Sequence, residues 1–184
     1  MLKLYYRLPN GKSFAHVSRS GTTTLAGHAL KKFFPDKHAQ WEEESSHAPQ
    51  YYLEESWSNR LPPKCLVMVR NPVERLQSLI ARNQYDPELT RFALETCERI
   101  GSISRSISRS LSIVTFHHLA PIDHISDNDS HFIKFPKLEE ACEYLGLDFD
   151  LSIHLNKQRN TVEELPAEFV RKIQDAIGIW EALK

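Results

Sequence analysis

The sequence lacks the features that mark several large classes of protein. Three widely spaced cysteines in 184 residues predict neither a disulfide framework nor a CxxC metal knuckle, so a reducing compartment is the simplest interpretation, although one disulfide stays open. No apolar run approaches about 18 residues, and the N-terminus has no signal-peptide core. We therefore expect a cytoplasmic chain that neither spans nor enters a membrane.

The sequence also lacks an excess of charge of one sign. Lys and Arg total 23 and Asp and Glu total 24, so the formal net charge is -1. Because polyanion binding normally requires a basic excess, we expect no nucleic-acid partner. The composition, 41% hydrophobic and 26% charged, is that of an ordinary globular protein. A small anion held in a local pocket stays compatible with it, since a few arginines leave the total unchanged.

The hydrophobic pattern predicts an α/β fold in one domain, residues 1–184. Residues 3–17 indicate a β-hairpin with a type I′ turn at Asn10-Gly11, and the apolar run 65–69 indicates a strand buried on both faces. Further strands and helices are expected in alternation. Helices are expected after Thr24, from Pro72 and over about 87–112. A strand at 131–135 follows, and then helices from Leu138 to Gly146 and over about 166–183. This order predicts three layers, with a mainly parallel central sheet flanked by helices.

The strongest local pattern is the segment Ser18-Arg19-Ser20-Gly21-Thr22-Thr23-Thr24, between a strand and a helix. A turn containing glycine at a helix start directs several backbone N–H groups to one place, where the helix dipole adds positive potential. The threonine hydroxyls and Arg19 would supply further donors and a cation. The pattern indicates a cradle for phosphate or sulfate, and an ordinary capped helix start is an equally good interpretation of this segment alone.

A second cation stands at the end of a predicted buried strand. Arg70 follows residues 65–69 and precedes Asn71-Pro72-Val73-Glu74, a typical helix start. Open α/β sheets bind ligands at this edge. A nucleotide triphosphatase is disfavoured, because Gly11-Lys12-Ser13 lacks the first glycine of a Walker A loop and Arg70 stands where an acidic residue would hold magnesium.

Together the two segments resemble sulfotransferases that use 3′-phosphoadenosine 5′-phosphosulfate (PAPS). Their 5′ loop typically reads Pro-Lys-x-Gly-[Ser/Thr]-Thr-[Ser/Thr], and residues 18–24 match it with Ser for Pro and Arg for Lys. Their 3′-phosphate motif reads Arg-[Asp/Asn]-Pro-x-x-Arg-x-x-Ser, and residues 70–78 fit each defined position. Weaker similarity, closest to carbohydrate sulfotransferases, extends over most of residues 14–184. The resemblance implies a P-loop-type fold.

The resemblance also implies roles for residues. The cofactor-binding residues would be Arg19, Ser20, Gly21, Thr22, Thr23 and Thr24 for the 5′-phosphosulfate, and Arg70 and Ser78 for the 3′-phosphate. Arg19 would be catalytic as well, by stabilising charge on the bridging oxygen as the sulfuryl group leaves. The family needs no metal, and no metal site stands out among the nine histidines.

The general base that must deprotonate the acceptor is less clearly marked. His47 is our first candidate, Glu54 or Glu55 the second and His118 the third. For each, an exposed or structurally paired side chain is an equally good interpretation. Later in the chain, Lys157 and Arg159 either close over the cofactor or belong to a solvated basic loop.

The resulting hypothesis is a compact PAPS-dependent sulfotransferase that acts on a hydroxyl, or an amine, of a carbohydrate or small-molecule acceptor. Because 184 residues are few for that family, we expect a minimal acceptor site, open to solvent or completed by a partner chain in a homo-oligomer. The alternatives are a nucleotide kinase-like P-loop phosphotransferase that depends on ATP and Mg²⁺, and a non-catalytic module that binds PAPS or its product PAP.

Overall fold

The chain forms two compact units. The computed structural model describes residues 3–17, 20–44, 48–82, 126–153, 167–172 and 174–183. Unit 1 comprises Met1–Val69 and Asp123–Lys157, and unit 2 comprises Arg70–Ile122 and Gln158–Lys184. The helix predicted over 87–112 lies outside the described residues, and the single domain predicted for 1–184 stays a prediction.

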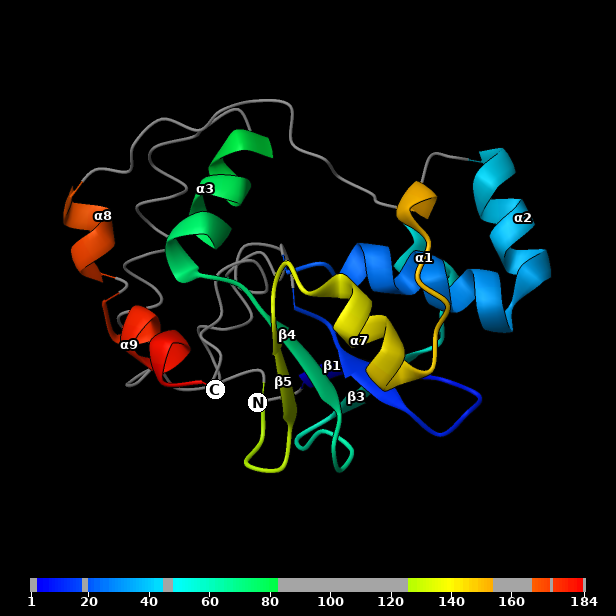
Figure 1. Cartoon of the computed structure of the whole chain (residues 1–184), viewed down its shortest axis with the longest axis horizontal. Coiled ribbons are helices and arrows are strands. Elements are labelled where there is room, and N and C mark those ends of the chain that lie inside the picture. The colour runs from blue at the N-terminus through cyan, green and yellow to red at the C-terminus, as the bar shows by residue number, and fades with distance from the viewer. Residues whose placement is uncertain are drawn as a thin grey trace. The chain divides into compact units, whose positions relative to one another are not determined.

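Unit 1 contains a five-stranded sheet (Figure 1). Its strands are β1 (Lys3–Arg7), β2 (Ser13–Ala15), β3 (Glu55–Ser58), β4 (Leu66–Val69) and β5 (His131–Lys134), in the spatial order β3-β1-β2-β4-β5. The pairings β1–β2 and β1–β3 are antiparallel, whereas β2–β4 and β4–β5 are parallel. The α/β class predicted from the sequence is therefore confirmed, and the described sheet is mixed rather than mainly parallel.

The structure confirms the predicted hairpin between β1 and β2. Its turn, however, is not the predicted type I′ turn. A type I′ turn needs a positive φ at both central residues, and Lys64 is the sole non-glycine residue with a positive φ among the residues described. The loop instead has three residues: Leu8 N–H donates to Lys12 O at 2.8 Å, and Gly11 N–H donates to Leu8 O at 3.0 Å. Pro9 explains the difference, because its φ near -65° suits the second position of an ordinary turn.

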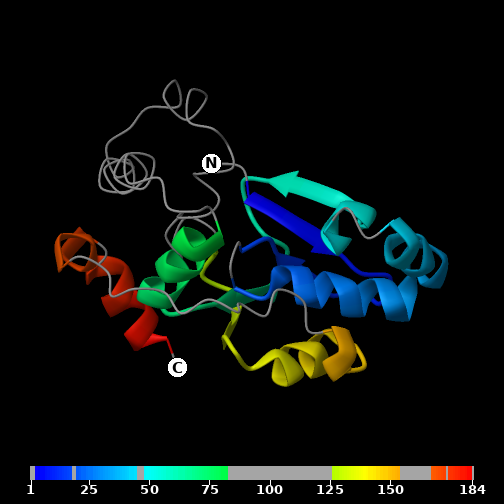
Figure 2. The ribbon, with the colours of Figure 1, turned by 90° about the horizontal axis from the view of Figure 1, so that it is seen from above.

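Two helices of unit 1 cover one face of the sheet (Figure 2). They are α1 (Thr22–Phe33) and α7 (Leu138–Leu145), and their buried residues join those of the strands in one core. Strand β4, which lies between β2 and β5, is buried along its whole length, as its apolar run predicts. Gly146 ends α7 with a φ of 69° and donates its N–H to Glu143 O at 3.0 Å, which confirms the predicted glycine cap.

The segment between α1 and β4 contains a helix and a 3₁₀ turn before β3, and the sequence pattern predicts neither. Helix α2 (Pro35–Glu44) begins directly on Pro35, and a 3₁₀ turn, η1 (Pro49–Tyr52), precedes β3. Helix α1 ends just before Pro35. Because proline is favoured at the first position of a helix, the same residue begins α2. Helix α2 has no buried residue, so it gives no apolar stripe by which the sequence could reveal it.

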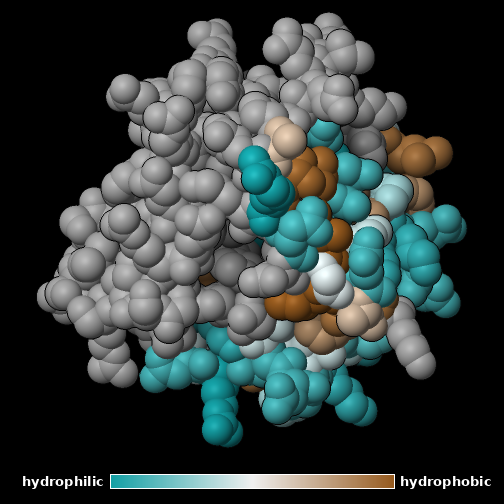
Figure 3. All heavy atoms as spheres, turned by 90° about the vertical axis from the view of Figure 1, so that its left-hand side faces the viewer, coloured by the Kyte–Doolittle hydropathy of each residue, from teal (hydrophilic) through white to brown (hydrophobic). Residues whose placement is uncertain are grey.

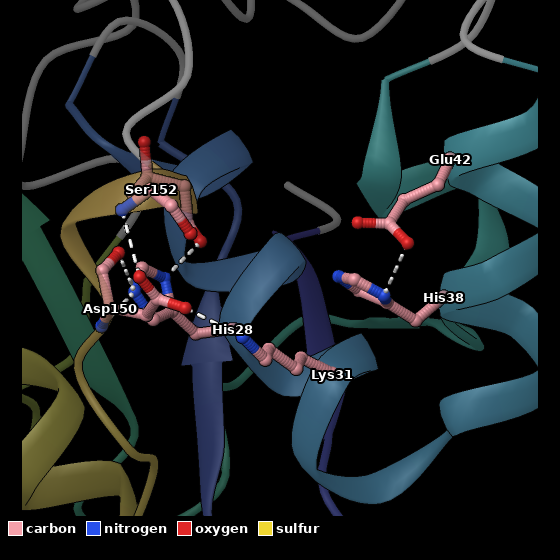
Figure 4. Close-up of polar contacts among 7 residues, drawn as sticks. His28, Lys31, His38, Glu42, Asp150 and Ser152 are labelled. Atoms are coloured by element: carbon pink, nitrogen blue, oxygen red, sulfur yellow. Dashed lines mark hydrogen bonds and ion pairs between the residues drawn. The ribbon is translucent and has the colours of Figure 1, made fainter.

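A buried histidine ties α1 to the segment after α7, which includes the 3₁₀ turn η2 (Leu151–Ile153) (Figure 4). The His28 ring is 1% exposed, and its Nδ1–H donates to Thr24 O at 2.8 Å. Its Nε2 accepts the Asp150 N–H at 3.0 Å, and the ring stacks on Phe149 with centroids 5.5 Å apart. Both ring nitrogens are therefore satisfied in the neutral imidazole.

Replacing His28 by leucine should lower the free energy of unfolding by about 2 kcal/mol, because the partly buried Asp150 N–H loses its acceptor. The matched control is His38→Leu on α2: His38 Nδ1 lies 3.6 Å from Glu42 Oε2, and its buried Nε2 has no partner among the described residues. Urea unfolding measures both. Equal effects at the two positions would contradict the structural role of His28.

Asp150 also makes this segment sensitive to acid. Lys31 Nζ lies 2.6 Å from Asp150 Oδ2, and the Ser152 N–H donates to Asp150 Oδ1 at 2.8 Å (Figure 4). The bond from Lys31, followed by those from Ser152, lowers the pKa of the Asp150 carboxyl from its ordinary 3.8. Since a depressed folded-state pKa stabilises the fold above the unfolded-state pKa, this contribution is lost as the pH falls below about 3.8.

We therefore expect the difference in melting temperature between the wild type and Asp150→Asn to be constant above about pH 5 and to shrink toward pH 2. Asp148→Asn is the control: it removes the same charge from an ion pair with Lys32, in which the Asp148 side chain is 84% exposed. This control should change the melting temperature less, since exposed pairs stabilise weakly. A difference for Asp150→Asn that grows on acidification would contradict the sign of the pKa shift.

In unit 2 the structure describes three helices. They are α3 (Pro72–Arg82), α8 (Ala167–Lys172) and α9 (Gln174–Ala182), and α3 and α9 contact each other. Asn71 caps α3 as predicted, because its Oδ1 accepts the Val73 N–H at 2.9 Å. The helix predicted over about 166–183 is present as α8 and α9.

Candidate anion-binding site

The parallel strands of unit 1 bring their carboxyl ends to one edge of the sheet. Phe14 of β2 pairs with Leu66 of β4, and Val69 of β4 pairs with Lys134 of β5. Residues 16 and 17 therefore leave β2 at the edge where β4 and β5 end (β4 and β5 are labelled in Figure 1). Open α/β sheets bind their ligands at this edge.

The segment that joins β2 to α1 is closed by one threonine. Thr22 Oγ1 donates to Val17 O at 2.8 Å and accepts the Val17 N–H at 3.1 Å, and the Ser20 N–H donates to Val17 O at 3.3 Å. Because both roles of the Thr22 hydroxyl are used within the loop, this side chain fixes the shape of the loop. Thr22 would thus contribute its backbone N–H, rather than its hydroxyl, to an anion.

Gly21 stands at the start of α1 in a conformation that suits glycine. Its φ is 90°, and a Cβ built on it would lie 3.0 Å from Leu138 Cδ2, 3.3 Å from Phe135 Cδ2 and 3.5 Å from Met68 Sδ. The backbone of the loop therefore packs against β4 and the start of α7. A side chain at this position would meet both backbone strain and a crowded core.

The start of α1 offers backbone donors that have no acceptor within the helix. The first four N–H groups of a helix have no intrahelical acceptor, and Gly21 makes no side-chain cap. Ser20 Oγ is fully buried and has no hydrogen-bond partner among the described residues. Since buried hydroxyls are normally hydrogen-bonded, the unsatisfied hydroxyl beside these N–H groups suits an anion with several oxygen atoms.

The second motif lies in unit 2, at the start of α3. Arg70 is bonded to the last residue of β4, and its Nε lies 3.3 Å from Glu74 Oε2. Ser78, predicted to bind the 3′-phosphate, is 7% exposed, and Arg75 is equally buried. Both follow Asn71 at helical spacing, so they lie on one face of α3. Arg75 was given no role in the prediction, although it occupies a defined position of the motif.

The predicted catalytic residues are only partly described. Arg19, His47 and His118 lie outside the described residues, as do Lys157 and Arg159. Glu54 is exposed between η1 and β3, and Glu55 is the first residue of β3, opposite Tyr6 of β1. Of the candidate bases, the structure therefore describes Glu54 and Glu55 alone. The order of preference among the candidates stays a prediction.

The structure adds two residues at this edge that the sequence analysis missed. Lys134 is the half-buried last residue of β5. It is a cation at the carboxyl end of a parallel strand, and this is the pattern by which the sequence indicates Arg70. His16 follows β2, and its Nδ1 lies 3.1 Å from the hydroxyl of Tyr6. No motif marks His16, because its contact depends on the register between β1 and β2.

Other properties of the described residues do not identify a ligand. On the face shown in Figure 3, hydrophilic and hydrophobic residues lie side by side in the described part, so hydropathy does not mark a binding surface. Within the described ranges, no group of three or more His, Cys, Asp and Glu residues is arranged to hold a metal ion. No described helix combines the length and apolar composition that a membrane crossing requires.

Comparison with known proteins provides no relative: no family model, curated protein or solved structure matches the chain.

Proposed function

We propose that the protein is a PAPS-dependent sulfotransferase. The observation that carries this proposal is the loop before α1, where Gly21 is required by its φ of 90° and by its packing, and where the buried Ser20 hydroxyl has no partner among the described residues. Its residues suit a tetrahedral anion, which is the chemistry that the 5′-phosphosulfate of PAPS presents. A P-loop-like arrangement of the domain belongs to the same proposal.

The motif at residues 70–78 supports a nucleotide that carries a second phosphate. Arginine suits phosphate recognition because its planar guanidinium presents donors in a fixed fork. Arg70 would bind the 3′-phosphate together with Ser78, and Arg75 would support this face of α3. A 3′-phosphate distinguishes PAPS and PAP from ATP, so this motif favours sulfuryl over phosphoryl transfer.

The chemistry required of the chain is positioning and charge stabilisation. The N–H groups of residues 21–24 and the Ser20 hydroxyl would hold the oxygens of the phosphosulfate, with Arg19 near the bridging oxygen. The acceptor oxygen or nitrogen forms a bond to sulfur while the bond from sulfur to the bridging oxygen breaks. The acceptor's proton passes to a base, for which His47, Glu54 or Glu55 and His118 remain the candidates, and PAP leaves with the electron pair.

The melting temperature of the full chain tests the choice between nucleotides. We expect PAP and PAPS to raise it in the presence of EDTA, and ATP to have little effect with or without Mg²⁺, because ligands that bind the folded state stabilise it. Stabilisation by ATP with Mg²⁺ alone would favour a kinase-like enzyme instead. Transfer of radiolabelled sulfuryl groups to a library of carbohydrate and small-molecule acceptors then separates an enzyme from a module that only binds PAP.

A further inference from the structure

Strand β3 ends at the same edge of the sheet as the candidate anion-binding site. Strand β1 pairs antiparallel with both β2 and β3, so β2 and β3 run in the same direction and their carboxyl ends lie at one edge. Figure 2 shows that β3 (cyan) points to the side on which α1 (blue) begins. The last residues of β3 therefore lie toward the loop before α1.

Trp57 of β3 belongs to a row of residues that crosses three strands near this edge. It pairs with Leu4 of β1, whose carbonyl oxygen accepts the His16 N–H at 2.8 Å. Because side chains alternate along a strand, this row shares the face of Tyr6, which α1 covers. Neighbouring strands lie about 4.8 Å apart, so the backbone of Trp57 is about 10 Å from that of His16, the residue before the anion loop.

This row is less covered than the row before it on the same face. Tyr6 and Phe14 are buried, whereas Leu4 and His16 are half-buried and Trp57 is 46% exposed. The exposed part of the indole is present in addition to the contacts that Trp57 makes within the protein. A large aromatic side chain that reaches solvent beside a polar site suits the binding of a ligand with both apolar and polar groups.

The charge on this face of β3 is negative. Glu55 lies two residues before Trp57, so it faces the same side, roughly 7 Å away along the strand, and it is exposed. Burial, and then the charge of Glu55, raise the pKa of the Tyr6 phenol, as expected for a carboxylate on the face of Tyr6. Glu55 is the charged residue of β3, and Glu54 before it is also exposed.

The basic residues next to β3 act on the other face of the sheet. Lys3 pairs with the last residue of β3 and alternates with Leu4, and its Nζ lies 2.6 Å from Asp127 Oδ1. Although burial opposes the shift, the bonds from Lys3 and from the Leu61 N–H, together with the charge of Arg60, lower the pKa of the Asp127 carboxyl. Both cations therefore lie near Asp127, and the surface around Trp57 keeps the charge of Glu55.

We propose that Trp57 and Glu55 bind a sugar ring of the acceptor, and that this acceptor is an uncharged carbohydrate. The C–H groups on one face of a pyranose are apolar and suit the indole, and its hydroxyl groups donate hydrogen bonds to the Glu55 carboxylate. An acidic sugar brings a second negative charge, which Glu55 repels. The inference rests on the proposed function and names the substrate class of the same site.

Titrations with small glycosides test the proposal on the full chain saturated with PAP. The uncharged probes are methyl β-D-glucoside, methyl β-D-galactoside and methyl N-acetyl-β-D-glucosaminide, and the acidic probes are the corresponding glucuronide and galacturonide. Saturation-transfer NMR measures the dissociation constants. We expect at least one uncharged glycoside to bind, and each uronide to bind at least about fivefold more weakly than its uncharged counterpart, because of the repulsion by Glu55.

Substitutions of Trp57 test the stacking contact. Trp57→Ala should weaken binding of the uncharged glycoside about tenfold, whereas Trp57→Phe, which keeps an aromatic ring, should stay within about threefold of the wild type. Leu151→Ala is the control, since it shortens another exposed apolar side chain, 75% exposed on η2, and it should bind as the wild type does. Equal losses in the two Trp57 variants, or no loss in Trp57→Ala, would overturn the proposal.

Glu55→Gln tests the charge, because glutamine keeps an acceptor oxygen and removes the carboxylate. This variant should bind the uncharged glycoside within about threefold of the wild type and should lose most of the preference over the uronide. Glu43→Gln, the same change at an exposed position of α2, should retain the preference. A merely structural role of Glu55 would leave the preference unchanged, and that result would exclude Glu55 from the acceptor site.

Binding of PAP distinguishes this inference from the proposed function. All four variants should bind PAP within about twofold of the wild type, and circular dichroism verifies that each one folds. Binding of PAP without binding of any uncharged glycoside, or a preference for the uronides, would overturn the inference alone. Failure of the wild type to bind PAP would refute the proposed function, and the same titrations without PAP would then decide whether Trp57 and Glu55 bind a sugar.

Discussion

Gly21→Ala is expected to destabilise the protein by about 2–5 kcal/mol and to abolish PAP binding. The left-handed conformation alone disfavours an alanine by about 1–2 kcal/mol. In addition, the new methyl group would lie 3.0 Å from Leu138 Cδ2 and 3.3 Å from Phe135 Cδ2, and such overpacking adds about 1–3 kcal/mol. Relief of this contact would move the loop, and with it the N–H groups proposed to bind the anion.

Gly11→Ala is the matched control for this substitution. Gly11 also has a positive φ, 81°, but a Cβ on it would have no atom within 4 Å. This variant should therefore show the conformational effect alone, about 1–2 kcal/mol, and bind PAP normally. Urea unfolding and calorimetry measure both variants. If Gly21→Ala is no less stable than Gly11→Ala, the packing described for the loop is wrong.

Arg70→Ala is expected to have the second large effect, on affinity rather than stability. Loss of a charge-assisted contact to the 3′-phosphate should weaken PAP binding about a hundredfold. Loss of the ion pair with Glu74 should cost little stability, because it is an i,i+4 contact in which the Glu74 side chain is 54% exposed. Arg70→Lys should recover only part of the affinity, since a lysine lacks the planar fork of donors.

The control for Arg70→Ala is Arg171→Ala, which makes the same change of charge at an exposed position of α8. It should bind PAP as the wild type does. Equal losses in the two variants would show that PAP responds to overall charge, and normal binding by Arg70→Ala would exclude Arg70 from the site.

The elements that the sequence predicts correctly have local signals. The buried run that forms β4, the cap of α3 at Asn71 and the cap of α7 at Gly146 each depend on a few adjacent residues. The missed elements have weak signals of this kind: α2 buries no residue, and β3 is an edge strand with two exposed residues. Asn10-Gly11 alone predicts a two-residue turn after β1, whereas the preceding Pro9 favours the three-residue loop that the structure shows.

The candidate site likewise has features that local sequence predicts and features that depend on tertiary packing. The loop before α1 is readable from its glycine and threonines, but the use of the Thr22 hydroxyl by Val17 depends on how the loop closes. The buried, unpartnered hydroxyl of Ser20 and the contact between Tyr6 and His16 depend on tertiary packing. Sequence reasoning can therefore locate the loop, whereas the roles of its individual side chains require the structure.

The most direct test of the proposed function is a calorimetric titration of the full chain, in EDTA, with PAP and with AMP. The two nucleotides differ by the 3′-phosphate alone. The account predicts that PAP binds at least about tenfold more tightly than AMP, because Arg70 and Ser78 are proposed to bind the additional phosphate. Equal affinities, or no binding of either nucleotide, would contradict it.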